Sequence, residues 1–249
     1  MIEMEVRFMG IFGALSGGIT EILLYLLTMA FMLLAILPVH ECAHALMAKI
    51  LGDDTAQRAG RLTLNPMAHL NPMGALCMLL IGFGWAEPVP VNPVRFNNQK
   101  RRQGYMALVA FAGPLSNLIM SLLWLIVYRI IRCFDMSYSF YTNMSYVMSL
   151  LIVVNLGLAV FNLLPIGPLD GAKIFNWIIP DRAMYKIQNS LSKIMSGIHP
   201  AFYLILFFVV VRLLSTPLNH VENWLLDRMI DGVDAVFGLF GLGYGNVTY

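Results

Sequence analysis

The chain is poor in charged residues. Only 12% of its 249 residues are Asp, Glu, Lys or Arg, whereas soluble domains run nearer about a quarter. No charge at all occurs from Ile22 to Val39, from Tyr105 to Tyr128, or from Met136 to Leu169. A membrane-spanning helix needs about 20 mostly apolar residues, and several of these runs qualify. The composition excludes an ordinary soluble domain and predicts an all-α polytopic membrane protein.

The chain also has few cysteines and a small net charge. Cys42, Cys77 and Cys133 show no CxxC spacing, which argues against structural disulfides. The net charge of +2, with no basic tract carrying interleaved aromatics, gives no support for nucleic-acid binding. No small-residue cleavage site follows a short apolar core near the N-terminus. We therefore expect the first apolar run to be retained.

Proline and glycine divide the chain into three parts. Residues 1–18 form a lead-in, 19–199 a core, and 200–249 an additional membrane helix with an amphipathic tail from Pro217. Within the first span Pro38 removes a backbone donor and loosens the helix, and Gly52 is a natural stop. The expected spans are Ile19–Leu51, Tyr105–Tyr128, Ser145–Leu164 and a weaker Ile194–Val211, interrupted at His199-Pro200.

The stretch 60–93 differs from the spans on either side. Repeated Asn-Pro and Pro-x-Pro pairs break any helix there, and the apolar run Met73–Gly84 has only twelve residues. Twelve residues are short for a span and suit a re-entrant segment. Non-helical backbone at membrane depth must be buried in protein or line a wet cavity. We expect a short β or re-entrant region here that lines the site; a plain juxtamembrane loop is the alternative.

The basic residues predict the orientation. In a four-span arrangement eleven of the sixteen share one side, which the positive-inside rule makes cytoplasmic. Those eleven are Lys49, Arg58, Arg61, Arg95, Lys100, Arg101, Arg102, Lys173, Arg182, Lys186 and Lys193. The end of the first span and Asp170 then both lie toward the cytoplasm.

The stretch His40-Glu41-Cys42-Ala43-His44 ends that first span. Two histidines four residues apart share one helix face, and the His-Glu-x-x-His arrangement is typical of a zinc metalloprotease. His40 and His44 would be metal ligands. Glu41 would be the base that takes a proton from water. The alternative is a chance helix turn, but ionisable residues beside an apolar run favour function.

A catalytic zinc takes three protein ligands and one water. Asp170 ends an uncharged stretch, where an unpaired carboxylate is costly unless it binds a cation. It could equally be a helix cap or turn residue in the Pro168–Gly171 segment. His69 is a further candidate ligand or substrate contact, although a lone loop histidine is more often neither.

Two amides interrupt the apolar helices. Asn117 and Asn162 could make interhelical hydrogen bonds, or could contact the developing oxyanion or the substrate backbone. The residues alone favour the interhelical bond. We expect His199 and His220 to be structural or interfacial, and Cys42 to be a packing residue.

Together these motifs resemble the site-2 protease family of intramembrane zinc metalloproteases, over about residues 20–175. The resemblance is to the compact bacterial branch, so we expect no PDZ or CBS domain. It rests on motifs in the family's order, namely His40–His44, Gly60–Pro66, Gly84–Pro93, Ala112–Asn117, Asn162–Pro165 and Leu169–Gly171.

The resemblance implies a core of three membrane helices, with one to three further membrane or interfacial helices. It implies Zn²⁺ held by His40, His44 and Asp170, and Glu41 as the base. It also implies that Asn117 and Asn162 contact the substrate or the oxyanion. For both residues the resemblance therefore favours a functional role over an interhelical hydrogen bond. The stretch 60–93 would present substrate as an extended strand.

Three residues depart from the family's usual pattern. Glu87 stands where a basic residue is usual, Asn71 where aspartate is common and Gly167 where proline is common. They affect loop shape and substrate preference rather than the reaction.

The sequence thus predicts a multi-pass cell-membrane zinc endopeptidase that cleaves transmembrane segments of other proteins near the cytoplasmic face. Its partners would be a transmembrane protein substrate and the lipid bilayer. The sequence leaves open whether the chain forms homo-oligomers. The alternatives are a catalytically silent membrane metal-binding or scaffold protein, and a metal transporter. A transporter would want ionisable residues on several spans, whereas this chain has one cluster.

Overall fold

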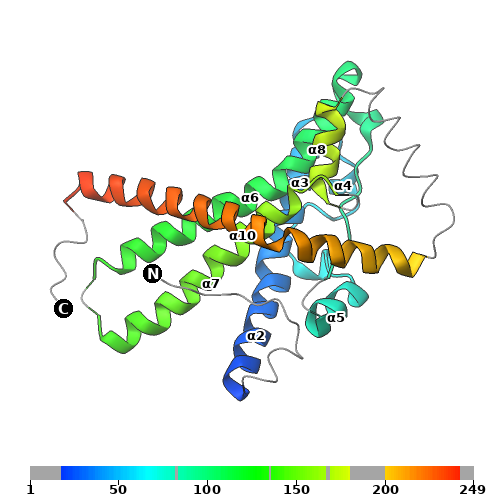
Figure 1. Ribbon diagram of the computed structural model, residues 1–249. Coiled ribbons are helices and arrows are strands. Elements are labelled where there is room, and N and C mark those ends of the chain that lie inside the picture. Colours follow the sequence, from blue (N-terminus) through cyan, green and yellow to red (C-terminus); the bar gives the residue numbers. More distant parts are fainter. Residues whose placement is uncertain (1–17, 82–83, 135, 167–168, 180–199, 242–249) are drawn as a thin grey trace. The chain divides into compact units, whose positions relative to one another are not determined.

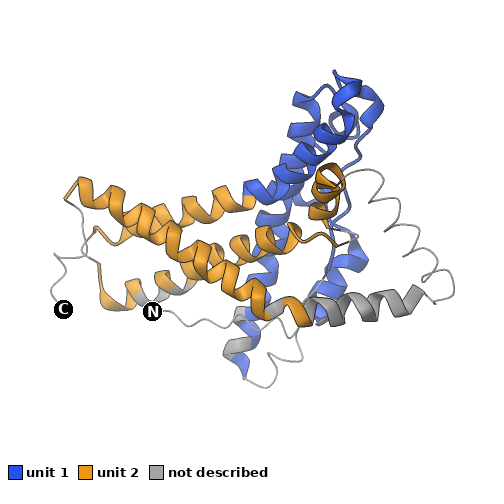
Figure 2. Cartoon of the chain, turned by 45° about the horizontal axis from the view of Figure 1, so that its top comes forward, with its two compact units in different colours: residues 1–116 blue, residues 117–249 orange. Residues whose placement is uncertain are grey.

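The computed structural model describes residues 18–81, 84–134, 136–166, 169–179 and 200–241 (Figure 1). These residues are mostly helical and contain no β-strand. The chain divides into two compact units, residues 1–116 and 117–249 (Figure 2), and each is described by itself. The mainly helical prediction is confirmed.

The first unit begins with one helical path in three parts. Helix α2 (Ile19–Phe31) passes through a π-helical turn, η2 (Met32–Ile36), into α3 (Leu37–Ile50). Pro38 lies just after the wide turn, which accommodates its missing N–H and its bulky ring. The path ends at Gly52, whose φ of 103° is left-handed. The expected loosening at Pro38 and the stop at Gly52 are both present.

Short elements follow in the first unit before its last helix. They are α4 (Thr55–Arg58), η3 (Pro66–Ala68), α5 (Pro72–Ile81), η4 (Pro93–Arg95), η5 (Gln99–Arg101) and α6 (Arg102–Ile131), which continues into the second unit. Buried Asp53 ties the segment together, because it accepts hydrogen bonds from the backbone N–H groups of Thr55 (3.0 Å) and Asn92 (2.6 Å). Tyr25 anchors α5 to α2 by donating to the carbonyls of Met78 and Leu79.

The expected strands in 60–93 are not formed among the described residues. One isolated antiparallel bridge joins Leu70 to Ala86, and the N–H of Glu87 donates to the carbonyl of His69. The apolar run, predicted to be a re-entrant segment, forms the short helix α5. The prolines remove donors on both sides of the bridge, which prevents a longer ladder.

The second unit contains the end of α6 with α7 (Tyr138–Asn162), α8 (Asp170–Ile178) and α10 (Pro200–Leu239). Helix α7 starts earlier than predicted because Ser137 caps it, accepting from the N–H of Phe140. The Ser121 hydroxyl donates to the Ile152 carbonyl and fixes α6 against α7.

The predicted additional helix and the predicted tail from Pro217 are continuous in the structure. Helix α10 is a single helix that carries Pro217 inside it. Its later part packs through Leu226, Met229, Ile230 and Val233 on Leu125 and Ile152, and this packing offsets the backbone bond lost at the proline. The interruption predicted at His199 lies outside the described residues.

Two helical stretches of the described residues are long and apolar enough to cross a membrane, Tyr25–Ile50 and Gln99–Ile131. A shorter apolar stretch covers Val147–Asn162. They coincide with the first, second and third predicted spans.

Candidate metal centre

Helix α3 places His40 and His44 on successive turns of one face. Both side chains are buried, and their Nε2 atoms lie 3.1 Å apart. The two rings are nearly perpendicular, with centroids 4.7 Å apart. Two imidazole nitrogens bound to one tetrahedral zinc at 2.0–2.1 Å would be about 3.3 Å apart. The pair is therefore already arranged for a single ion.

A backbone carbonyl orients the second ring. His44 Nδ1 lies 2.7 Å from the carbonyl oxygen of Val109 on α6, which requires Nδ1 to carry the proton. The lone pair is then on Nε2, the atom that faces His40. Metal-binding histidines commonly have such a partner, which fixes the tautomer and the ring orientation.

Gly113 on α6 is the close neighbour of both rings. A Cβ atom at this position would lie 2.6 Å from His40 Nε2 and closer still to His44 Nε2. The absence of a side chain leaves the space in front of the two nitrogens open. That space has the donors and the location expected of a metal site.

Glu41 lies between the two histidines in the sequence and is half-buried. It is one residue after His40 and three before His44, so it lies beside the ligand face of α3. A carboxylate there can exchange a proton with a water molecule at the site.

The other predicted site residues belong to the second unit. Asn117 on α6 is fully buried. Asn162 ends α7, and its amide nitrogen donates to the Leu158 carbonyl of the same helix at 2.9 Å. This hydrogen bond of Asn162 is local rather than interhelical.

Asp170 is the first residue of α8 and is buried, with 7% of its surface exposed. Leu169, not Asp170, occupies the cap position, so the helix-cap interpretation is wrong. Lys173 Nζ lies 3.3 Å from Asp170 Oδ1. The next residue, Gly171, packs directly on the carbonyls of Leu163 and Leu164, where a side chain would not fit. This contact joins the start of α8 to the end of α7.

The loop residues His69 and Asn71 make hydrogen bonds within the first unit. His69 is fully buried in the first unit, with Nε2 2.9 Å from the Thr63 carbonyl, and holds the turn around η3. Asn71 donates to Glu87 at 3.1 Å, so two of the positions that depart from the family pattern contact each other. Cys42 is half-buried with a free thiol.

Sequence reasoning missed Val109 and Gly113 as parts of the site. Val109 acts through its backbone carbonyl, which no side-chain pattern reveals. Gly113 did leave a signal, because glycine in a helix interior costs about 1 kcal/mol relative to alanine and needs a packing reason.

Comparison with known proteins identifies the family. The profile of peptidase family M50 matches residues 129–206. YwhC of Bacillus subtilis, whose assigned name proposes a zinc metalloprotease, is 38% identical over 203 residues, or 81% of this chain and 85% of YwhC. The chain belongs to peptidase family M50. The predicted site-2 protease resemblance and the predicted enzyme class, a zinc metalloprotease, are confirmed.

Mycobacterial relatives carry similar names. Rip2 of Mycobacterium tuberculosis is 31% identical over 196 residues, which covers 76% of this M50 chain and 68% of Rip2. Rip2 of Mycolicibacterium smegmatis is 32% identical over 134 residues, which covers 53% of this chain and 49% of that protein. No solved structure matches the chain.

Proposed function

We propose that this M50 peptidase holds one zinc ion through His40, His44 and Asp170 and hydrolyses peptide bonds in transmembrane segments of other proteins. The observation that carries the proposal is the pair of buried Nε2 atoms 3.1 Å apart, held open by Gly113. Asp170 is proposed as third ligand because it is a buried carboxylate in the family's Leu-Asp-Gly motif. A buried carboxylate favours a cation beside it.

The chain's own residues then move the proton. Zinc, when bound, makes water acidic enough to ionise near neutral pH and polarises the substrate carbonyl. Glu41 accepts the proton of the attacking water, whose oxygen bonds to the carbonyl carbon. As the C–N bond breaks, Glu41 passes that proton to the leaving amine nitrogen. Asn117 and Asn162 donate N–H groups to the carbonyl oxygen or to the substrate backbone.

The bilayer is the proposed setting. The two long apolar helices support a multi-pass membrane location. The excess of basic residues on one side supports a site toward the cytoplasm. A transmembrane substrate must unwind locally, because the amides of an intact helix are hydrogen-bonded and shielded.

Zinc analysis combined with cleavage tests the proposal. Purified Glu41→Gln protein should keep zinc and lose cleavage of a transmembrane substrate, whereas His40→Ala and Asp170→Ala should lose zinc. The exposed Asp227→Asn is the control for removing a carboxylate. Full zinc occupancy in Asp170→Ala would contradict the third ligand. Full turnover by Glu41→Gln would contradict the mechanism.

Capture experiments address the substrate. Glu41→Gln should bind substrate without cleaving it, so cross-linking in membranes followed by mass spectrometry should recover membrane-spanning proteins. Recovery of soluble proteins alone would contradict an intramembrane substrate.

A further inference from the structure

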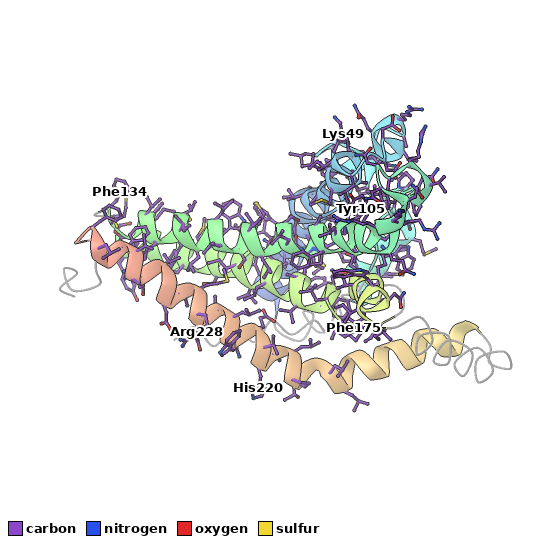
Figure 3. All side chains as sticks on the ribbon, turned by 90° about the horizontal axis from the view of Figure 1, so that it is seen from above. Lys49, Tyr105, Phe134, Phe175, His220 and Arg228 are labelled. Atoms are coloured by element: carbon purple, nitrogen blue, oxygen red, sulfur yellow. The ribbon has the colours of Figure 1, made fainter. Side chains whose placement is uncertain are left out.

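Helix α10 packs along the membrane-type helices of the second unit. Its side chains from Leu226 to Phe237 contact α6 and α7 around a buried cluster of Leu125, Ile152 and Val233. Figures 1 and 3 both show the later part of α10 beside the end of α6, and Figure 1 shows α10 crossing α7. On the opposite side of α10, His220 and Arg228 are exposed (Figure 3).

One end of this contact is held by an ion pair. Arg129 near the end of α6 is buried, and its Nε lies 2.7 Å from Asp234 Oδ1 on α10. The Arg129 guanidinium also lies over the ring of Phe237, 5.7 Å from its centroid. Each buried charge at this end has an opposite charge beside it.

The other end of the contact carries a carboxylate, that of Glu222, with no cation beside it in the part of the chain that the structure describes. The two oxygens of Glu222 lie over Gly157 of α7, and a Cβ at Gly157 would be only 3.4 and 3.5 Å from them. These are ordinary van der Waals distances, so the carboxylate rests against α7 at Gly157 and a methyl group there would still fit, whereas a larger side chain would not. Helix α7 has no acidic, basic or histidine residue along its length.

No described charge on the neighbouring elements compensates Glu222. His220 is exposed and contacts the Thr216 carbonyl. The remaining described charged groups of these elements are engaged elsewhere or exposed: Arg129 pairs with Asp234, Lys173 with Asp170 and Arg228 with Asp231, Arg132 lies over the Tyr141 ring, and Asp227 is exposed. Burial therefore disfavours the charged form of this carboxylate.

We propose that α10 is a proton-controlled strap, docked on α6 and α7 while Glu222 is protonated and loosened when Glu222 ionises. Loosening would expose the apolar surface around Leu125 and Ile152. The proposal concerns the second unit alone and does not depend on the peptidase mechanism.

The direction of the pH effect follows from burial. Desolvation raises the pKa of Glu222 from 4.5 to about 7. A group with a raised pKa in the docked state stabilises docking fully below its free pKa, and this contribution is lost as the pH rises through about 7. Because the carboxylate is only partly buried, we expect docking to weaken on the order of 100-fold, less than the full pKa shift implies.

A cysteine reporter in the docked surface tests the strap. In the full-length protein, Val233→Cys should be protected from alkylation, while Val236→Cys, 52% exposed, serves as the reference at each pH. The ratio of the two rates, quantified site by site by mass spectrometry, removes the effect of thiol ionisation. We expect this ratio to rise at least about tenfold from pH 5.5 to pH 8.5.

Matched variants assign the effect to the carboxylate. Glu222→Gln should keep the ratio low at every pH, whereas the exposed Asp227→Asn should behave as the parent protein. Gly157→Leu should displace Glu222 and raise the ratio at every pH, while Gly157→Ala should be tolerated. If Val233→Cys does not fold, the buried Leu125→Cys on α6 provides the same reporter. A flat ratio in the parent protein, or an unchanged pH response in Glu222→Gln, would overturn the proposal.

Discussion

Replacing Gly113 by alanine should disable the metal site without altering any ligand. The added carbon would lie 2.6 Å from His40 Nε2 and closer to His44 Nε2. Ordinary contacts between such atoms are about 3.5 Å, so the rings or α6 must move by about 1 Å. The histidine nitrogens would then no longer converge on one point.

The expected loss of affinity is large. Metal sites tolerate deviations of about 0.2 Å in ligand distance, several times less than this displacement. Changes to groups that only orient a ligand cost about 10–100-fold in metal affinity. We expect Gly113→Ala to weaken zinc binding by at least about 100-fold, the upper end of that range. Helix propensity acts in the opposite direction, because alanine is favoured over glycine by about 1 kcal/mol.

Zinc competition against a chromogenic chelator measures the effect, with circular dichroism as the check on folding. Gly232→Ala is the matched control, because it also lies in a helix but its Cβ would meet nothing within 4 Å. That control should bind zinc as the parent protein does. A folded Gly113→Ala protein with unchanged zinc affinity would refute the packing argument.

Three further outcomes are expected. Glu41→Gln should lower the cleavage rate by about 10²–10⁴-fold at unchanged zinc content, and a loss of zinc instead would make Glu41 a structural residue. Asp53→Ala should reduce the free energy of unfolding by roughly 3 kcal/mol. Asp54→Ala removes only exposed ion pairs and should reduce it by under about 1 kcal/mol. Equal losses of stability in thermal unfolding would contradict the role of buried Asp53 in holding this segment. Arg129→Met should cost about 2–3 kcal/mol, because it leaves Asp234 largely buried without a partner, and an unchanged melting temperature would show that the pair contributes nothing.

The close approach of His40 and His44 was predictable from the sequence because it depends on helix geometry alone. Residues four apart on α3 share a face in any α-helix, so the spacing of His40 and His44 determines their approach. The family motifs also indicated Asp170 and its neighbour Gly171. These predictions needed no knowledge of the long-range packing.

The surroundings of the pair were not predictable in the same way. Val109 and Gly113 contribute through a backbone carbonyl and a missing side chain, and both depend on where α6 crosses α3. The strand prediction for 60–93 failed because prolines on both sides of the Leu70–Ala86 bridge remove the backbone donors that a longer ladder needs. The continuity of α10 through Pro217 was not predictable either, because it depends on tertiary packing that outweighs a local helix-breaking preference.

X-ray absorption at the zinc edge of the purified protein tests the central claim most directly. We expect two imidazole nitrogens and oxygen ligands at about 2.0–2.2 Å, with one oxygen contribution lost in Asp170→Ala. A sulfur shell at about 2.3 Å, which would bring Cys42 into the site, or a spectrum that does not change in Asp170→Ala, would contradict the proposed centre.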